Sequence, residues 1–287
     1  MGDVLAGNHA VWEFDSDSVL IRFERGIRTP RLWSALGQRR IPYEALAGLS
    51  VTAGKRDTVV LRAEPRPGAD PLAEVAAGQL RDVCDPYRLV LPGERAARAQ
   101  SLAEALEARL TDEPAERFLV EVPQPPLQLK AYDARATFEA GAVTFRWSRT
   151  GASSTKWKSG DRTYPLADIS DVEWHSPEGP GGHLRLVLRD GGGAERGGAD
   201  RGAVPVPADQ DPAAVVFGMG NGAVHESLPF AAAVLAAIRR RTPVAAGPGP
   251  GREDTSDRLR HLAELHGAGL LTDAEYTTLR DRFTADA

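Results

Sequence analysis

The chain has 287 residues, 42% of them hydrophobic, and a formal net charge of −5. This describes a globular protein with room for two domains of ordinary size, and the mild acidity argues against nucleic-acid binding by the protein as a whole. The single cysteine, Cys84, excludes an internal disulfide and a cysteine-rich metal site, and fits a reducing compartment.

The sequence repeats itself at a fixed spacing. Ala10–Arg25 (AVWEFDSDSVLIRFER) aligns with Ala134–Arg149 (ARATFEAGAVTFRWSR) at an offset of 124, and Trp33 aligns with Trp157 at the same offset. A constant offset over such a span indicates duplication of one structural unit. We therefore divide the chain into a first repeat (8–112), a linker (113–131), a second repeat (132–242), a second linker (243–255) and a tail (256–285).

Each repeat begins with predicted strands. At Val19–Phe23, the apolar residues Val19, Ile21 and Phe23 alternate with Leu20 and Arg22, and Val143–Trp147 alternates in the same way with Thr144 and Arg146. This period of two is typical of half-buried strands. Further strands are expected at Ile41–Val51, Thr58–Arg62, Tyr164–Trp174 and Leu184–Arg189. Two segments rich in Gly, Pro and charge, Pro65–Gly78 and Gly191–Asp211, are predicted to be long exposed loops.

Each repeat ends in a predicted helix. The apolar stripes of the two helices are Ala99, Leu102, Leu106 and Leu110 in the first, and Phe230, Val234, Leu235 and Ile238 in the second. Ser227 is a candidate N-cap with Pro229 in the first turn, and Arg239–Arg241 suit a helix C-terminus. In the linker, Phe118–Val122 offers an edge strand. Strands followed by one helix, twice, predict an α+β fold.

The tail is predicted to be a helical hairpin. Gly267 and Gly269 end its first helix, and Thr272 with Glu275 forms a capping box that starts the second. A hairpin this short lies below the roughly 40 residues that an isolated domain needs, so its apolar side chains should dock on another surface. The side chains assigned to oligomerisation or docking are Leu259, Leu262, Leu265, Leu270, Leu271, Tyr276, Leu279 and Phe283.

Two resemblances follow from these motifs. Gly269–Thr272 (GLLT) and the pair Glu275-Tyr276 resemble the SHOCT (short C-terminal) domain. Trp12–Phe14, Val19–Phe23 and Ile41-Pro42, with their counterparts in the second repeat, resemble the pleckstrin-homology-like (PH-like, GRAM-like) domains of unknown function that precede SHOCT tails in actinobacteria. The resemblance implies two tandem PH-like domains, each a bent seven-stranded antiparallel sandwich or barrel capped by a C-terminal helix.

The loop that follows Phe23, and its counterpart after Trp147, is basic and contains an aligned tryptophan. Arg and Lys beside an aromatic ring can hold phosphate headgroups, with about 1 kcal/mol from each cation near an anionic surface. The alternative interpretation is an ordinary solvated face, partly neutralised by Glu24 and Asp161. The candidate anion ligands are Arg22, Arg25, Arg28, Arg31, Arg39 and Arg40 in the first repeat, and Arg146, Arg149, Lys156, Lys158 and Arg162 in the second.

The sequence contains no recognisable catalytic constellation. Phe217–Ala223 (FGMGNGA) resembles a phosphate-binding glycine loop, but the βαβ signature downstream is missing, which favours a flexible turn. His225-Glu226-Ser227 joins three catalytic residue types, yet triads are assembled in space and not in sequence. Because the histidines are scattered and Cys84 has no neighbouring base, we expect no metal site, no cofactor and no enzymatic activity.

We therefore expect a cytoplasmic, non-enzymatic binding or scaffold protein. Its tandem domains would offer a surface to a protein or ligand, for example by strand addition at an open sheet edge. Its tail would mediate self-association or docking to a protein partner. The second hypothesis is peripheral binding to anionic membrane lipids through the basic loops, and a hydrolase with an unrecognised site ranks third. We expect no secretion signal and no membrane span, since the longest apolar run, Leu228–Ile238, is too short.

Overall fold

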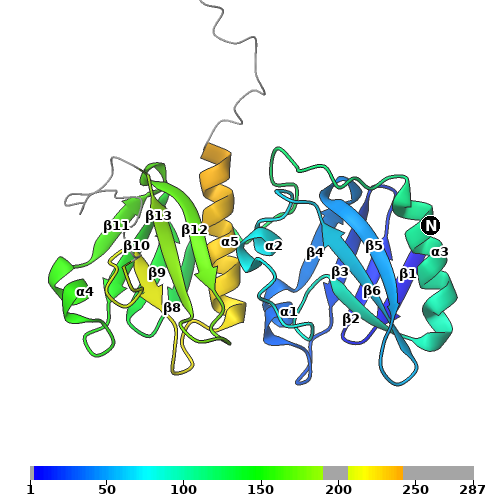
Figure 1. Cartoon of the computed structure of the whole chain (residues 1–287), viewed down its shortest axis with the longest axis horizontal. Coiled ribbons are helices and arrows are strands. Elements are labelled where there is room, and N and C mark those ends of the chain that lie inside the picture. Colours follow the sequence, from blue (N-terminus) through cyan, green and yellow to red (C-terminus); the bar gives the residue numbers. More distant parts are fainter. Residues whose placement is uncertain (1–2, 190–205, 242–287) are drawn as a thin grey trace, which may run out of the picture. The chain divides into compact units, whose positions relative to one another are not determined.

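The computed structural model describes residues 3–189 and 206–241, which belong to one compact unit. These residues form a mixed α+β structure with four antiparallel sheets, two in each of two repeated units (Figure 1). The predicted hairpin at 256–285, with its docking residues, and the linker at 243–255 lie outside the described residues, as does most of the predicted loop Gly191–Asp211.

The first repeat consists of a four-stranded sheet, a three-stranded sheet and a terminal helix. The four-stranded sheet contains β1 (Asp3–Gly7), β2 (Ala10–Phe14), β3 (Ser18–Phe23) and β4 (Gln38–Pro42), in that order. The three-stranded sheet contains β5 (Leu46–Ala53), β6 (Thr58–Pro65) and β7 (Arg88–Pro92). The helices are α1 (Arg31–Leu36), α2 (Pro71–Ala76) and α3 (Ala96–Glu107).

Among the described residues, the second repeat has the same strands and terminal helix in the same order, without counterparts of α2 and of the 3-10 turn at Gly93–Arg95. Its four-stranded sheet contains β8 (Leu127–Lys130), β9 (Ala134–Glu139), β10 (Ala142–Trp147) and β11 (Arg162–Pro165). Its three-stranded sheet contains β12 (Ile169–His175), β13 (His183–Leu188) and β14 (Ala214–Val216), and its helices are α4 (Ser154–Ser159) and α5 (Val224–Arg241). The predicted duplication is therefore confirmed.

The two sheets of each repeat meet at one corner and do not close into the barrel that was one of the expected forms. In the first repeat, the Asn8 N–H donates to the Val90 carbonyl (2.8 Å). The equivalent bond in the second repeat runs from the Tyr132 N–H to the Val216 carbonyl (2.9 Å). No other backbone ladder joins the two sheets within the described ranges.

Strand periodicity places the core as expected. On β10, Val143, Phe145 and Trp147 are buried while Arg146 is exposed. On β3 the pattern differs from the prediction, because Leu20, on the outer face, is also buried. Leu20 lines a groove together with linker residues 119–123, so the chain itself reduces the exposure of this outer face.

Several predicted boundaries were wrong. The predicted strand Ile41–Val51 is interrupted by one turn of 3-10 helix at Tyr43–Ala45, and Tyr164–Trp174 is interrupted in the same way at Leu166–Asp168. In both places a proline precedes the turn, and its fixed φ ends the preceding strand. Phe118–Val122 does not form the predicted edge strand.

Two segments taken for connections are structured. Pro65–Gly78, predicted to be an exposed loop, contains the largely buried helix α2, which starts because the Asp70 carboxylate accepts the Leu72 N–H (2.9 Å). Leu127–Lys130, assigned to the linker, is strand β8, which pairs with β9. The second repeat therefore begins before residue 132, and the first sheet likewise begins at Asp3 with β1.

Helix α5 begins earlier than its capping signal indicated. It starts at Val224, so Ser227 is not its N-cap and Pro229 lies inside the helix. The buried Ser227 hydroxyl accepts the Trp174 indole N–H (3.0 Å) and donates to the Ala223 carbonyl (3.1 Å). Arg239–Arg241 occupy the last turn, as predicted.

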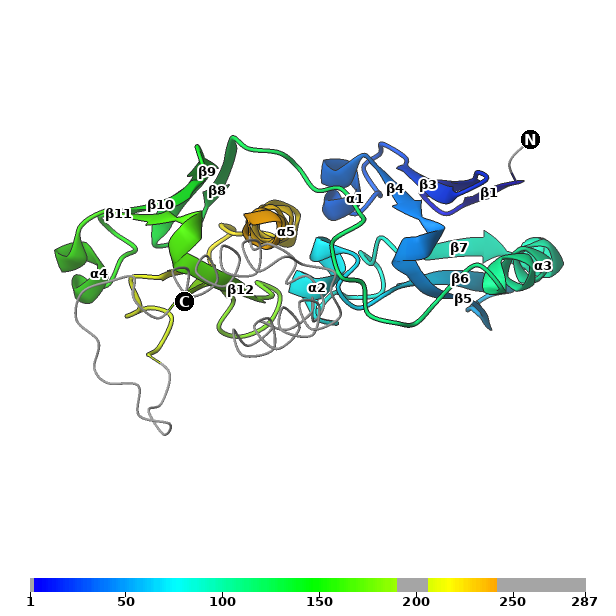
Figure 2. The same cartoon turned by 90° about the horizontal axis from the view of Figure 1, so that it is seen from above.

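Helix α5 also joins the two repeats. It packs on β8 and β12 of its own repeat and on α1 and α2 of the first repeat (Figures 1 and 2). The segment Ala231–Ala236 of α5 is therefore buried on every side. The equivalent helix α3 buries one side, with Ala99, Ala103 and Leu106, and exposes the opposite side to solvent. Gln79 adds two hydrogen bonds across this contact, to the Trp174 carbonyl and from the Ser176 N–H (both 2.9 Å). The two repeats share one hydrophobic core.

Candidate functional site

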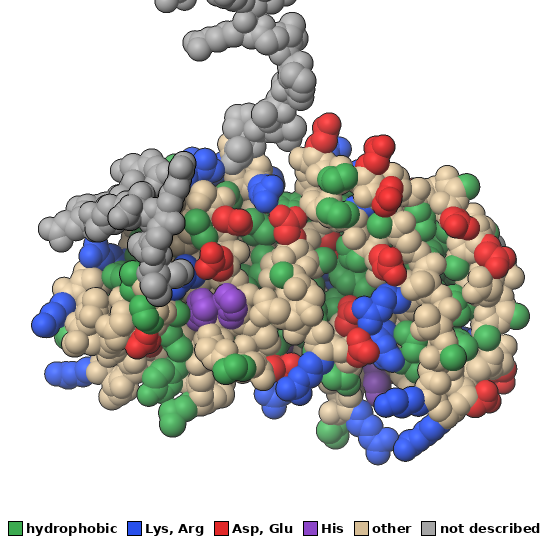
Figure 3. Space-filling view, viewed as in Figure 1, with side chains coloured by type: hydrophobic (Ala, Val, Ile, Leu, Met, Phe, Trp, Pro, Cys, Tyr) green, Lys and Arg blue, Asp and Glu red, His purple; other side chains and the backbone are tan. Residues whose placement is uncertain are grey.

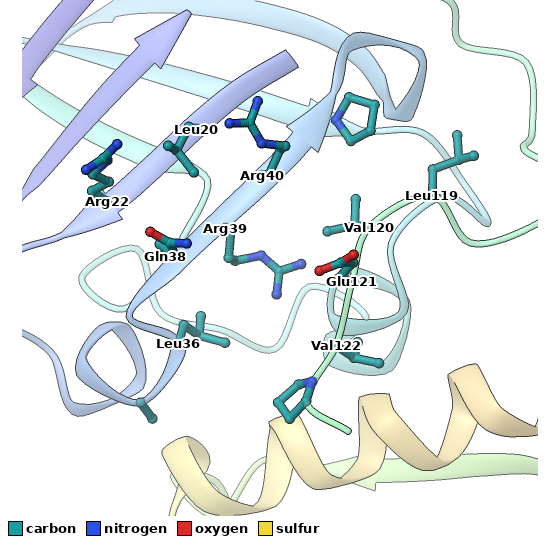
Figure 4. Close-up of a pocket in the computed structure, with 13 residues that line it drawn as sticks. Leu20, Arg22, Leu36, Gln38, Arg39, Arg40, Leu119, Val120, Glu121 and Val122 are labelled. Carbon is teal, nitrogen blue, oxygen red and sulfur yellow. The ribbon is translucent and has the colours of Figure 1, made fainter. Parts of the chain in front are cut away.

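A groove in the first repeat lies between the outer face of β3–β4 and the linker segment 119–123 (Figure 4). Its volume is about 770 Å³. Arg22 and Arg40 flank it on the sheet, and Arg39 points toward the linker residues Val120 and Glu121. Three of the predicted anion ligands thus meet here.

The cations of this groove are already neutralised. Each arginine forms an ion pair with a carboxylate: Arg22 with Glu13 (3.1 Å), Arg40 with Asp15 (2.9 Å) and Arg39 with Asp70 (2.8 Å). The Arg39–Asp70 pair is buried, and its guanidinium also donates to the Tyr87 hydroxyl (3.1 Å). Arg39 therefore has a structural role, because it links β4 to Asp70 and Tyr87, and we remove it from the candidate anion ligands.

A second groove, of about 640 Å³, opens on the second repeat. Three segments meet around it: the turn between β8 and β9, the loop after β10, and the glycine-containing segment Phe217–Ala223. The groove is lined by Lys130, Ala131, Tyr132, Ala134, Arg135, Arg146, Trp147, Ser148, Thr150, Met219 and Asn221. None of these described residues is acidic, so the charge of this groove is positive.

Three of the lining residues stand side by side across the sheet. Lys130 on β8 pairs with Arg135 on β9, and Arg135 pairs in turn with Arg146 on β10. Directly opposed residues of antiparallel strands point to the same face, and all three residues are exposed. No carboxylate of the described residues forms an ion pair with any of them. We call Lys130, Arg135 and Arg146 the cation row.

The cation row has no counterpart in the first repeat. The equivalent positions, paired in the same register on β1, β2 and β3, are Ala6, Val11 and Arg22. Arg22 is thus the single cation of that row, and Glu13 neutralises it. Like charges directly opposite one another on a sheet destabilise it, so folding gives no reason for the row in the second repeat.

A buried ion pair supports the turn that separates Lys130 from Arg135. The Lys156 ammonium, fully buried, lies 2.5 Å from Oδ2 of Asp133. Oδ1 of Asp133 accepts the Val216 N–H (2.8 Å), and the ammonium lies 5.1 Å from the centre of the Trp147 ring. Lys156 is therefore a structural residue as well, and it too is removed from the candidate anion ligands.

The remaining predicted ligands are exposed at the two basic loops. In the first repeat, Arg25, Arg28 and Arg31 are exposed, and Ile27, which lies between Arg25 and Arg28 in the sequence, is fully exposed. In the second repeat, Arg149 is exposed on the loop before α4, Lys158 is exposed on α4, and Arg162 is exposed at the start of β11. Trp157, also on α4, is 52% exposed. Figure 3 shows several Lys and Arg side chains at this end of the second repeat.

The aligned tryptophans have different surroundings. Trp33 is 6% exposed, packs on Phe23 with ring centres 5.2 Å apart, and donates its indole N–H to the Cys84 carbonyl (2.9 Å). Helix α1, which carries Trp33, lies against α5, whereas α4 has no equivalent neighbour among the described residues. Trp33 is therefore a core residue, and Trp157 a surface residue.

The segment Phe217–Ala223 forms a tight turn beside the second groove. The Gly222 N–H donates to the Lys130 carbonyl (2.8 Å), which ties the turn to β8. Gly222 has a φ of +74°, and a Cβ there would lie 2.1 Å from the Phe217 ring, so the position requires glycine. Met219, at the tip, is 88% exposed.

A pair of histidines and the single cysteine lie outside the lining of the two grooves. His175 and His183 stack with ring centres 4.4 Å apart, and burial lowers the pKa of His183. Burial raises the pKa of the Cys84 thiol, which is therefore protonated at neutral pH. The described residues contain no group of three or more His, Cys, Asp or Glu side chains placed to hold a metal ion. None of their helices is both long and apolar enough to cross a membrane.

Sequence reasoning singled out Arg146 but missed Lys130 and Arg135. Lys130 was assigned to the linker, and Arg135 stands alone between apolar residues of β9. On β9, Arg135 is exposed between the buried Ala134 and Ala136, and only the register with β8 and β10 brings the three cations together.

Comparison with known proteins yields one family and no individual relative. The family described as "Domain of unknown function (DUF4429)" matches the chain twice, at residues 12–107 and 136–235. Neither the curated proteins nor the solved structures contain a match to the chain. The two matched regions coincide with the two repeats and together cover more than half of the sequence. The chain belongs to the DUF4429 family and carries two copies of its domain.

Proposed function

We propose that the chain is a non-enzymatic binding protein built from two PH-like repeats. The support for the PH-like assignment is the element order. Each repeat has an antiparallel meander of four strands, a second meander of three strands and a terminal helix, which is the arrangement that the resemblance implies. We place the ligand surface on the outer face of the four-stranded sheet in the second repeat.

The observation that carries this proposal is the contrast between two equivalent surfaces. In the first repeat, linker residues 119–123 lie beside the outer face of the four-stranded sheet and reduce its exposure. Each arginine of the groove there forms an ion pair with a carboxylate. In the second repeat, Lys130, Arg135 and Arg146 are exposed on the equivalent face, and they have no carboxylate partner among the described residues. A surface with three opposed and unpaired cations favours a ligand that brings negative charge.

Retention on immobilised heparin, used as a generic polyanion, tests whether this face binds anions. We expect the full chain to be retained at low salt and the Arg135→Glu variant to elute earlier, because reversal places a carboxylate in the middle of the cation row. Arg22→Glu, which makes the same charge reversal at the first-repeat counterpart of Arg146, is the matched control and should cause the smaller change, because Arg22 already pairs with Glu13. Equal effects of the two variants would refute the proposed surface.

The tail would give this binding protein its scaffold role. We propose that the SHOCT-like segment at 256–285 mediates self-association or docking, because its apolar residues are too few to form an independent core. Light scattering of the full chain and of a chain truncated at Pro248 tests this. The proposal predicts a lower assembly mass after truncation, and an unchanged mass excludes self-association through the tail.

An open sheet edge supports a protein partner. Edge strand β5 (LAGLSVTA) has no charged residue, whereas its counterpart β12 carries Asp171 and Glu173. Charges on an edge strand discourage pairing with another chain, so β5 is the better template for strand addition. Ser50→Lys on β5 should weaken capture of an extended partner peptide, and an unchanged affinity would remove this mode of binding.

Membrane attachment is the second candidate function, and the two basic loops favour it. Ile27 is fully exposed on a loop whose sequence also carries the exposed Arg25 and Arg28. In the second repeat, Trp157 and Lys158 are exposed side by side in the sequence of α4. An exposed apolar side chain near cations suits an anionic bilayer surface. Flotation with anionic and neutral vesicles should show binding to the anionic vesicles that the double variant Arg25→Glu/Arg149→Glu loses. Equal binding to anionic and neutral vesicles would exclude this function.

A further inference from the structure

We infer that the cation row of the second repeat is a binding site for a ligand that carries two linked phosphate groups. This inference rests on the proposed function, which places the ligand surface on this sheet face, and it adds the chemical class of the ligand. The ligand's source is either a free diphosphate or a phosphorylated lipid headgroup, because both present the same oxygens.

The geometry of the row matches a linear pair of anionic groups. Neighbouring strands lie about 4.8 Å apart, so the backbone positions of the outer residues Lys130 and Arg146 are separated by roughly 10 Å, with Arg135 between them. One phosphate placed between Lys130 and Arg135, and a second between Arg135 and Arg146, would each contact two cations. A single monovalent anion would leave at least one of the three cations without a partner.

The residue types fit phosphate oxygens. Arginine presents a planar fork of N–H donors that binds two phosphate oxygens at once, and lysine supplies a compact point charge. Nearby lining residues add neutral donors, since the Ser148 and Thr150 hydroxyls and the Tyr132 phenol surround the same groove. Among the described residues, no carboxylate lines the groove to repel the ligand.

The walls of the groove are held in place before a ligand arrives. The Asp133–Lys156 pair fixes the turn between β8 and β9 from below, and the Gly222–Lys130 hydrogen bond fixes the glycine turn from the side. Preorganised donors lose little freedom on binding, which favours affinity. Exposed Met219 at the rim and Tyr132 beside the row offer apolar contact to whatever group the phosphates carry.

Titration calorimetry of the full chain with inorganic pyrophosphate tests the inference for a free ligand. We expect one site per chain, and an affinity that falls roughly tenfold or more in Arg135→Ala, because a charge-assisted pair is lost. Arg22→Ala is the matched control and should leave the affinity unchanged. Chloride and acetate at the same ionic strength should not compete.

A gain-of-function variant keeps the test independent of misfolding. The triple change Ala6→Lys, Val11→Arg and Glu13→Gln would build an equivalent row beside Arg22 in the first repeat. We expect the stoichiometry for pyrophosphate to rise from one to two in this variant.

Vesicle flotation supplies the lipid arm. Vesicles containing a lipid whose headgroup carries a diphosphate group are compared with vesicles of a neutral lipid. Flotation that depends on Arg135 but not on Arg25 or Arg149, without pyrophosphate binding in solution, identifies the headgroup as the source. Heparin retention that depends on Arg135, with neither pyrophosphate nor vesicle binding, overturns the diphosphate inference and leaves the proposed anionic surface standing. If heparin retention does not depend on Arg135 either, both the diphosphate inference and the proposed anion-binding surface are overturned.

Discussion

The buried Asp133–Lys156 pair should be a major contributor to the stability of the second repeat. Both side chains are buried, and the ammonium lies 2.5 Å from the carboxylate. Lys156→Met removes one charge and leaves the other in the protein interior, which costs about 3–5 kcal/mol of unfolding free energy. Asp133 keeps its hydrogen bond from the Val216 N–H (2.8 Å), so we expect a value near the lower end of that range.

Urea denaturation of residues 1–242, followed by tryptophan fluorescence and by circular dichroism, measures this loss. Coincidence of the two transitions is required before a single free energy is assigned. The double variant Asp133→Asn/Lys156→Met should cost less than the sum of the two single changes, because each single change strands a partner. Arg22→Met, which breaks the exposed pair with Glu13, should cost about 1 kcal/mol or less. Equal losses in Lys156→Met and Arg22→Met would refute the reasoning.

Three further predictions concern the core and its titratable groups. Ala232 lies on the same side of α5 as Arg239, which pairs with Glu74 of the first repeat. Ala232→Glu should therefore weaken the contact between the repeats and split the unfolding transition into two. A single transition in this variant would argue against the shared core. Burial lowers the pKa of His183 below 6.5, so the imidazole binds a proton more readily in the unfolded state than in the folded state. The free energy of unfolding should therefore fall as the pH drops below 6.5. Denaturation series between about pH 7 and 5 should show a weaker pH dependence in His183→Gln. Trp33→Ala should cost about 3–5 kcal/mol and Trp157→Ala within about 0.5 kcal/mol, and equal losses would contradict the assigned environments.

The repeated architecture could be predicted from local sequence patterns. Val19–Phe23 and Val143–Trp147 carry core-facing apolar residues with period two, and both are strands, although Leu20 on the outer face of β3 is buried as well. The fixed offset between them predicted the duplication of the whole unit. Helix α2 was missed because a Gly- and Pro-rich segment hid a short helix whose start depends on the side chain of Asp70.

The site depended on contacts that single-sequence reasoning does not supply. Arg39 and Lys156 looked like exposed ligands, but their partners Asp70 and Asp133 lie 31 and 23 residues away along the chain. Lys130 and Arg135 looked unremarkable until strand register placed them beside Arg146. In each case a long-range pairing, and not the local pattern, decides whether a cation is neutralised or free to bind.

Helix α5 illustrates the same limit. Its sequence FAAAVLAAI was interpreted as one apolar stripe, yet the run is apolar on every side because both repeats cover it. The side of α5 that faces away from its own repeat carries alanines because it packs against α1 and α2 of the first repeat. The equivalent helix α3, which has Arg98, Gln100 and Glu104 on its outer side, remains solvent-exposed there.

Hydrogen–deuterium exchange of the full chain with and without inorganic pyrophosphate tests the central claim most directly. The claim is that the second repeat carries the anion site and the first repeat does not. We predict slower exchange in peptides from Leu127–Trp147, which contain the cation row, and unchanged exchange in peptides from Asp3–Phe23. Protection of both segments, protection of the first alone, or no protection of Leu127–Trp147 would contradict the account.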